Sequence, residues 1–294
     1  MEDYENDLRG FVEDIARIPA ERGAEDYCKD GILTCGKCGD AKQAWIDWFP
    51  DENGNREKRL VRVMCRCDVE RDREEKERRA AADFEFTMRK INAALQTEPS
   101  DVRWTFDMDD SPDSPFSVTC RTYVAEWEAM KREHSGILLY GSKGNGKTFY
   151  ASCICNAVLQ KRESVGFTTA ANLMNILSAW DKTEILDAIR RVRLLVIDDL
   201  GTERSSSYGA ELMYSVIDAR YKTGLPTIVT TNLDLADMES ETDILRSRIY
   251  DRVIEMCPIK LKMLGESRRA MISDTRTEAV RKIMRDALRQ GGAK

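Results

Sequence analysis

The sequence has no apolar run approaching the ~18 residues that a membrane-spanning helix requires, so an integral membrane protein is not expected. Residues 1–5 are acidic, whereas a secretory signal begins with basic residues, so we expect a cytoplasmic protein. There is a single histidine, His134, which we interpret as a surface residue rather than a catalyst. Acidic residues (52) outnumber basic ones (46), giving a net charge of −6, which argues against binding a polyanion over the whole surface.

What the chain does contain indicates a folded protein of more than one part. Hydrophobic residues make up 42% of its 294 residues, enough for a packed core, so a disordered chain is excluded. Residues 68–79 are almost all charged and predict a solvated helix or spacer that continues as an amphipathic helix to Leu95. Proline and aspartate in residues 97–116 predict a linker. We therefore divide the chain into domains 1–96 and 117–294.

Five of the nine cysteines lie between Cys28 and Cys67. Without a secretory signal, cysteines are expected to be reduced thiols or metal ligands rather than disulfides. The pairs Cys35/Cys38 and Cys65/Cys67 flank a hairpin-sized insert, which predicts a structural Zn²⁺ site whose metal supplies folding energy to a small unit. Two alternatives stay open: Cys28 replaces one of the four ligands, or the thiols are simply reduced and buried.

From residue 117 onward, short apolar runs alternate with helical patterns, and this alternation predicts a doubly wound α/β fold with a parallel sheet. The expected strands are 136–140, 164–168, 194–197, 226–230 and 259–263. The expected helices are 117–133, 149–161, 171–180, 183–190 and 208–223.

A phosphate-binding loop follows the first of these strands and opens the next helix. Its residues match the pattern GxxxxGK[ST], whose glycines let backbone N–H groups surround phosphates at a helix N-terminus. Lys147 is expected to neutralise the β- and γ-phosphates of a nucleotide, and the Thr148 hydroxyl to bind Mg²⁺. The loop consists of Gly141, Ser142, Lys143, Gly144, Asn145, Gly146, Lys147 and Thr148.

Polar side chains end the next two core strands. Asp198 and Asp199 follow four apolar residues, at the strand end where open α/β sheets bind ligands. We expect Asp198 to hold Mg²⁺ through water and Asp199 to orient or deprotonate the attacking water. Asn232 follows the strand after that and is expected to face the γ-phosphate. The alternatives are an acidic helix cap and a turn-forming asparagine.

Five motifs, in this order and spacing, resemble the DnaC-type replicative helicase loaders, AAA+ ATPases close to the IstB transposition ATPases. They are the segments 197–204, 230–232, 248–252 and 265–269 and the upstream cysteine pattern. The resemblance implies an AAA+ P-loop domain with a small N-terminal zinc-binding domain that contacts the helicase. Because few residues follow Arg269, the C-terminal lid is expected to be reduced or absent.

The resemblance also implies roles and partners. Asn232 corresponds to the first sensor, Arg269 to the second, and Arg252 or Arg248 to the arginine finger that reaches a neighbouring subunit's ATP; an Arg-rich solvated helix face is the alternative. ATP, Mg²⁺ and Zn²⁺ are the implied cofactors, and a replicative helicase hexamer, single-stranded DNA and further copies of the chain are the implied partners. Single-strand contacts are implied in residues 169–191, where an ordinary amphipathic helix is the alternative.

Three other functions fit parts of the sequence. An IstB-like transposition ATPase would act on duplex DNA, but that family gives no expectation of a zinc module. A small-molecule kinase would carry no sensor and finger residues. A non-hydrolysing adaptor is disfavoured by the complete set of Lys147, Asp198 and Asp199.

Overall fold

The computed structural model describes residues 22–48, 56–97, 102–179, 182–201, 207–264 and 280–281. The chain divides into two compact units, Met1–Asp83 and Phe84–Lys294. Arg269, the turn of the predicted hairpin insert, and residues 180–181 of the segment with implied single-strand contacts lie outside the described residues. Within the described part of the chain, no helix has the length and apolar character to span a bilayer.

The N-terminal unit contains two antiparallel hairpins. Strand β1 (Tyr27–Lys29) pairs with β2 (Ile32–Thr34), and β3 (Gln43–Asp47) pairs with β4 (Lys58–Arg62), so that Trp45 lies opposite Leu60. The hairpins are joined by hydrogen bonds from the Lys42 N–H to the Leu33 carbonyl (2.7 Å) and from the Leu33 N–H to the side chain of Gln43 (3.0 Å). The insert between the cysteine pairs therefore forms the predicted hairpin.

Helix α2 (Arg66–Leu95) begins in the N-terminal unit and ends in the second one. Its first half is largely exposed and carries ion pairs one turn apart, such as Lys76 with Asp72 at 2.7 Å, which stabilise a helix that buries few side chains there. Its last turns bury Ile91 and Leu95 among apolar residues of the second unit. The charged segment is thus helical, as the sequence predicts.

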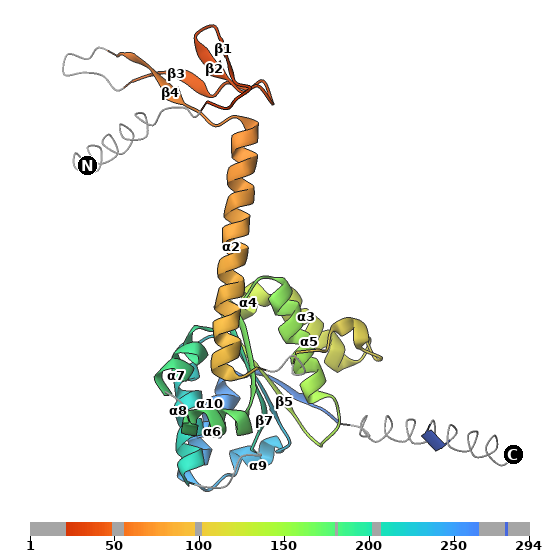
Figure 1. Cartoon of the computed structure of the whole chain (residues 1–294). Coiled ribbons are helices and arrows are strands. Elements are labelled where there is room, and N and C mark those ends of the chain that lie inside the picture. The colour runs from red at the N-terminus through yellow and green to blue at the C-terminus, as the bar shows by residue number, and fades with distance from the viewer. Residues whose placement is uncertain are drawn as a thin grey trace, which may run out of the picture. The chain divides into compact units, whose positions relative to one another are not determined.

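The second unit is built on a five-stranded parallel sheet with the order β6-β7-β8-β5-β9 (Figure 1). Helices α6, α7, α8 and α10 lie on one side of it and α3, α4 and α5 on the other. The strands are β5 (Ile137–Tyr140), β6 (Val165–Thr169), β7 (Leu194–Leu200), β8 (Thr227–Thr231) and β9 (Ile259–Lys262). The helices are α3 (Pro115–Ala125), α4 (Trp127–Arg132), α5 (Lys147–Gln160), α6 (Ala170–Ala179), α7 (Lys182–Arg191), α8 (Ser207–Tyr221), α9 (Leu235–Glu239) and α10 (Ile244–Met256).

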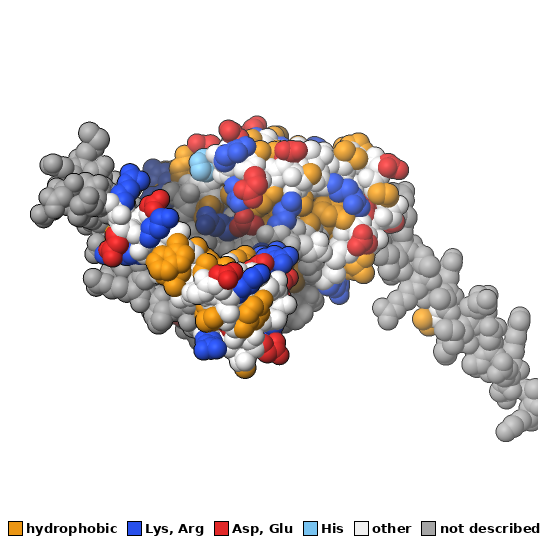
Figure 2. Space-filling model, turned by 90° about the horizontal axis from the view of Figure 1, so that it is seen from above, with side chains coloured by type: hydrophobic (Ala, Val, Ile, Leu, Met, Phe, Trp, Pro, Cys, Tyr) orange, Lys and Arg blue, Asp and Glu red, His pale blue; other side chains and the backbone are white. Residues whose placement is uncertain are grey.

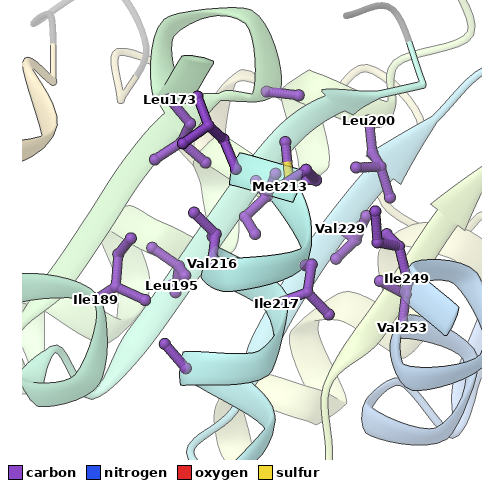
Figure 3. Close-up of a cluster of buried hydrophobic side chains, with 14 of the residues drawn as sticks. Leu173, Ile189, Leu195, Leu200, Met213, Val216, Ile217, Val229, Ile249 and Val253 are labelled. Carbon is purple, nitrogen blue, oxygen red and sulfur yellow. The ribbon is translucent and has the colours of Figure 1, made fainter. Parts of the chain in front are cut away.

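The doubly wound prediction is confirmed, because every pairing in this sheet is parallel and both of its faces are covered. Alternate residues of each strand point to opposite faces, so Leu195 and Ile197 pack in one core while Leu194 and Val196 pack in the other. Figure 3 shows the first core, where Leu195 and Val229 of the sheet meet side chains of α6, α7, α8 and α10.

Residues 102–114, part of the predicted linker, pack against α5. The side chain of Asn156 donates to the Trp104 carbonyl (2.7 Å) and to that of Val102, and the Trp104 N–H donates to Ser152 (3.1 Å). The short 3-10 helix η1 (Phe106–Met108) lies in this segment, and Phe106 packs against the second core. The described part of the predicted linker is therefore docked on α5.

The predicted helix 117–133 is two helices, α3 and α4, that change direction at Glu126. Helix α3 starts where the Ser114 side chain accepts a hydrogen bond from the Ser117 N–H and Pro115 takes the first helical position.

Arg220 on α8 is fully buried and makes five hydrogen bonds, all of them to uncharged oxygen atoms. These bonds join α8 to the end of α7 and to the starts of β7 and β8, and so fix the spacing of the layers. The acceptors are the Thr227 hydroxyl and the carbonyls of Ile189, Val192, Arg193 and Pro226.

Candidate nucleotide and zinc sites

The phosphate-binding loop lies between β5 and α5, in the context that the sequence predicts. Gly141, Gly144 and Gly146 all have positive φ values, of 120°, 86° and 90°. At Gly141 a side chain is also excluded by contact, because a Cβ there would lie 2.5 Å from the Met263 carbonyl oxygen. The loop conformation therefore depends on glycine, and it places backbone N–H groups at the N-terminus of a helix of 14 residues.

Lys147 is buried and its ammonium group is held at the mouth of this loop. It donates to the carbonyls of Gly141 (2.9 Å) and Ser142 (2.7 Å) and to the Asn232 side-chain oxygen (2.9 Å). The structure thus brings Lys147 and Asn232 together, although 85 residues separate them in the sequence. The ammonium group of Lys147 and the side-chain amide of Asn232 together form a site suited to a phosphate group.

Asp198 and Thr148 form an oxygen-rich pair beside the loop. The Thr148 hydroxyl lies 3.1 Å from both carboxylate oxygens of Asp198, and the Thr230 hydroxyl donates to one of them at 2.5 Å. Hydroxyl and carboxylate oxygens are the ligands that Mg²⁺ prefers, so these residues fit the ion that accompanies a nucleotide.

Asp199 has a left-handed backbone, with φ at 56°. The pairing of β7 with β8 shifts register between Ile197 and Leu200, and the Asp199 N–H is bound by the Thr230 hydroxyl at 2.9 Å. This irregularity separates the two acids, so that Asp198 is buried while Asp199 is partly exposed. Thr230 contacts both acids. The sequence pattern gave Thr230 no role, although its position at the end of the strand that leads to Asn232 could have indicated one.

The two candidate finger arginines of α10 lie in different surroundings. Arg252 is ion-paired with Asp218 of α8 at 2.6 Å and lies over the rings of Tyr214 and Tyr221, at 4.6 and 5.3 Å from their centroids. Arg248, one turn earlier, is exposed. Lys222 and Arg252 together lower the pKa of Asp218, so the carboxylate stays charged.

The four predicted zinc ligands converge in the N-terminal unit. The sulfur atoms of Cys35, Cys38, Cys65 and Cys67 all lie within 4.8 Å of one another. Tetrahedral Zn²⁺ with bonds of about 2.3 Å requires sulfur atoms roughly 4 Å apart, so the cluster fits this ion. Cys28, exposed on β1, is not part of it.

Surrounding contacts fix these ligands. Asp40 binds both the backbone N–H and the side chain of Arg66, which joins the two cysteine pairs. The Asp40 N–H lowers the pKa of the Cys38 thiol to about 7, whereas burial raises the pKa of Cys65 to about 12. A bound cation would offset the cost of a buried thiolate at Cys65.

The chain is similar to known proteins over the region that contains the nucleotide site. Over 139 residues the chain is 30% identical to the replicative helicase loader DnaC of Escherichia coli K12. The aligned region covers 45% of this chain and 54% of that protein. Over 261 residues it is 26% identical to the phage-like element PBSX protein XkdC of Bacillus subtilis 168, covering 83% of this chain and 84% of XkdC. The chain spans about half the length of the curated helicase loader that it matches.

A crystal structure of DnaI has the same fold, with a TM-score of 0.50 at 24% identity over 58% of this chain and 94% of that one. The family of IstB-like ATP binding proteins matches residues 70–275, which include the phosphate-binding loop, both acids and Asn232. Because this match extends over more than half of the chain and takes in every element of the nucleotide site, the protein belongs to the IstB-like ATP-binding family.

Proposed function

We propose that the protein is an ATP-hydrolysing loader that places a replicative DNA helicase on single-stranded DNA. The observation that carries the proposal is the joining of Lys147, Asn232, Thr148 and Asp198 at one edge of the sheet, in a chain similar to a helicase loader. Lys147 and the loop amides would bind the phosphates of ATP, and Thr148 and Asp198 would hold Mg²⁺, which neutralises phosphate charge.

Asp199 is the proposed base or orienting group for the attacking water. The Thr230 hydroxyl holds the Asp199 backbone beside Thr148 and Asp198. The partial exposure of Asp199 leaves its carboxylate accessible to water. Asn232 is proposed to sense the γ-phosphate, because its side-chain oxygen already contacts Lys147. Arg269 is proposed as the second sensor from sequence alone.

Arg248 is the better candidate for an arginine that acts on a neighbouring subunit. An arginine finger must be free to reach across an interface, and Arg248 is exposed. Arg252 is engaged by Asp218 and two tyrosine rings within its own chain, which favours a role in holding α10 against α8. An assembly of several copies is therefore part of the proposal.

The N-terminal unit is the proposed helicase-binding part. Its described residues expose large apolar side chains, and apolar side chains among charged ones are visible on the surface in Figure 2. Several exposed large apolar side chains on one small unit favour a protein-binding role. They are Tyr27, Trp45, Ile46, Met64 and Val69, between 38% and 56% exposed.

The proposal is tested with the purified chain, a replicative DNA helicase, and fluorescent DNA. We expect co-purification with the helicase, ATP-dependent binding to an oligo-dT strand in preference to blunt duplex, and helicase transfer to that strand. An Asp199→Asn variant should bind ATP normally and hydrolyse it far more slowly. Preference for duplex without helicase binding would instead support the alternative of an IstB-like transposition ATPase.

A further inference from the structure

The chain segment at the end of β9 contacts the phosphate-binding loop directly. The Met263 N–H donates to the Tyr140 carbonyl (2.7 Å), and the Met263 carbonyl accepts from the buried side chain of Asn145 (3.1 Å). The same carbonyl occupies the space where Gly141 would carry a side chain. Met263 is therefore fixed against both ends of the loop.

The residue before it, Lys262, reaches to the other side of β5. Its ammonium group binds the carboxylate of Asp234 at 2.5 Å and lies 5.9 Å from the centroid of the Tyr140 ring. Strand β5 separates β8 from β9 in the sheet, so this ion pair spans the strand that leads into the phosphate-binding loop.

Asp234 belongs to the short connection that carries Asn232. It begins α9, where it takes part in a capping box with Asp237. Leu233 lies between Asn232 and Asp234. Its N–H donates to the Thr231 hydroxyl (3.1 Å), and its side chain packs closely beside Gly201. Few backbone torsions therefore separate the ion pair from the amide that contacts Lys147.

These contacts close a ring around the loop. It runs from Lys147 to Asn232, along the chain to Asp234, across to Lys262, and back through Met263 to Asn145. The ion pair is the single contact in the ring that is made by two half-exposed charged side chains, 42% and 43% exposed. It is consequently the point where the ring can be opened without disturbing a buried core.

We propose that Asp234 and Lys262 form a positioning pair that fixes the connection carrying Asn232 relative to the phosphate-binding loop, and thereby sets the rate of ATP hydrolysis. The inference rests on the proposed ATPase function. Neither residue touches the reacting atoms; the pair acts through Asn232 and through Met263. The mutual attraction lowers the pKa of Asp234 and raises that of Lys262, so both are charged at neutral pH.

The test uses three substitutions in the full chain. Asp234→Asn removes the charge and keeps an oxygen that can cap α9, and Lys262→Met removes the charge and keeps an unbranched stem over Tyr140. Lys262→Arg keeps the charge and should restore the pair. Asp72→Asn is the matched control, because it removes a helix-surface ion pair with Lys76 through a carboxylate of similar exposure, 45%.

Two readouts are compared. Amide hydrogen exchange at residues 232–234 should accelerate by up to about fivefold in Asp234→Asn and Lys262→Met, the change that corresponds to an ion pair of this exposure. The kcat for ATP should fall about tenfold with KM within about twofold, since small displacements of a positioned group slow chemistry more than binding. The double variant should be no worse than either single one.

Each outcome decides. Unchanged exchange in both charge-removing variants overturns the ring, whether or not ATP is hydrolysed. Faster exchange with wild-type kcat overturns the effect on hydrolysis. Loss of kcat in Lys262→Arg as large as in Lys262→Met would show that the charge pair is not responsible. A wild-type chain that binds ATP without hydrolysing it refutes the ATPase proposal, while exchange still decides the pair.

Discussion

In the N-terminal unit the buried apolar side chains among described residues are Leu33, Cys35, Trp48 and Cys65, and two of these are zinc-ligand candidates. The second unit buries apolar side chains on both faces of its sheet, in two clusters that draw on every one of its strands. The N-terminal unit also buries the side chain of Lys42, which is paired with Asp26 at 2.8 Å, whereas the second unit buries mostly aliphatic side chains.

This difference predicts that folding and ligand binding are coupled in the N-terminal unit and separable in the second unit. A unit with so small an apolar core is expected to depend on the proposed Zn²⁺ ion, so that metal binding and folding would be one event. In the second unit the two apolar cores do not include Lys147, Thr148, Asp198 or Asn232, the residues proposed to contact the nucleotide and its Mg²⁺. Binding should therefore be removable there without loss of the fold.

Zinc removal gives the largest expected difference between the units. Chelation, or Cys65→Ser, should unfold the N-terminal unit, because metal binding supplies on the order of 10 kcal/mol in structural zinc sites of this kind. Nucleotide affinity in the second unit should be unchanged. Metal analysis, tryptophan fluorescence and titration with a fluorescent ATP analogue check both parts, with Cys28→Ser as the control that should keep its metal.

Within the second unit, Arg248→Ala should abolish catalysis while leaving the fold intact. An arginine that acts across an interface contributes about 10³–10⁵ in kcat, whereas its removal from an exposed position should leave ATP affinity unchanged. Mixing this variant with Lys147→Ala should restore some activity, since each chain supplies what the other lacks. Normal turnover by Arg248→Ala assemblies would transfer the role to Arg252.

Arg220→Met should reveal what the fold of the second unit does depend on. Five oxygen acceptors would lose their donor in the interior, at an expected cost of about 3–5 kcal/mol in the free energy of unfolding. Urea unfolding measures this, and the exposed Arg190→Ala serves as the comparison. A change below about 1 kcal/mol would mean that the layers are held by apolar packing alone.

Lys147→Ala should weaken ATP binding by about 100-fold with little change in unfolding, since a charged hydrogen-bond donor to phosphate is lost. The nearby exposed Lys143→Ala should have a much smaller effect. If both variants bind ATP equally well, the phosphate site has been misassigned. If Lys147→Ala unfolds the protein, binding and folding are not separable in this unit either.

Smallest is the expected effect of Arg252→Ala on stability. The half-buried ion pair with Asp218 and the contacts with Tyr214 and Tyr221 together suggest a loss of about 1–2 kcal/mol. Thermal unfolding of Arg252→Ala and Arg252→Lys distinguishes a packing role from a catalytic one. A catalytic defect without any loss of stability would contradict the packing role.

The sequence predicted the sheet well because its strands are buried on both faces and appear as continuous apolar runs, as in residues 194–197. It also predicted the phosphate loop, since the glycine positions are constrained by local backbone geometry. Contacts between distant segments could not be predicted from local pattern. The engagement of Arg252 by Asp218 and the docking of residues 102–114 on α5 both depend on tertiary packing.

Arg220 illustrates the same limit. In the sequence it is a basic residue near a helix end, where exposure is the usual expectation, and its burial follows only from the carbonyls that α7, β7 and β8 present to it. Zinc-ligand spacing, in contrast, is a local signal, and it identified all four cysteines that converge.

The left-handed backbone at Asp199 determines which substitutions at this position test the carboxylate alone. Asparagine and aspartate tolerate that conformation, whereas a β-branched residue does not, so a valine scan would combine strain with loss of the carboxylate. A mutational survey would then rank position 199 as structurally essential when only its chemistry had been sought. Comparing Asp199→Asn with Asp199→Gly and Asp199→Val would separate the two contributions, and would show how much of the residue's apparent intolerance to substitution arises from one backbone torsion.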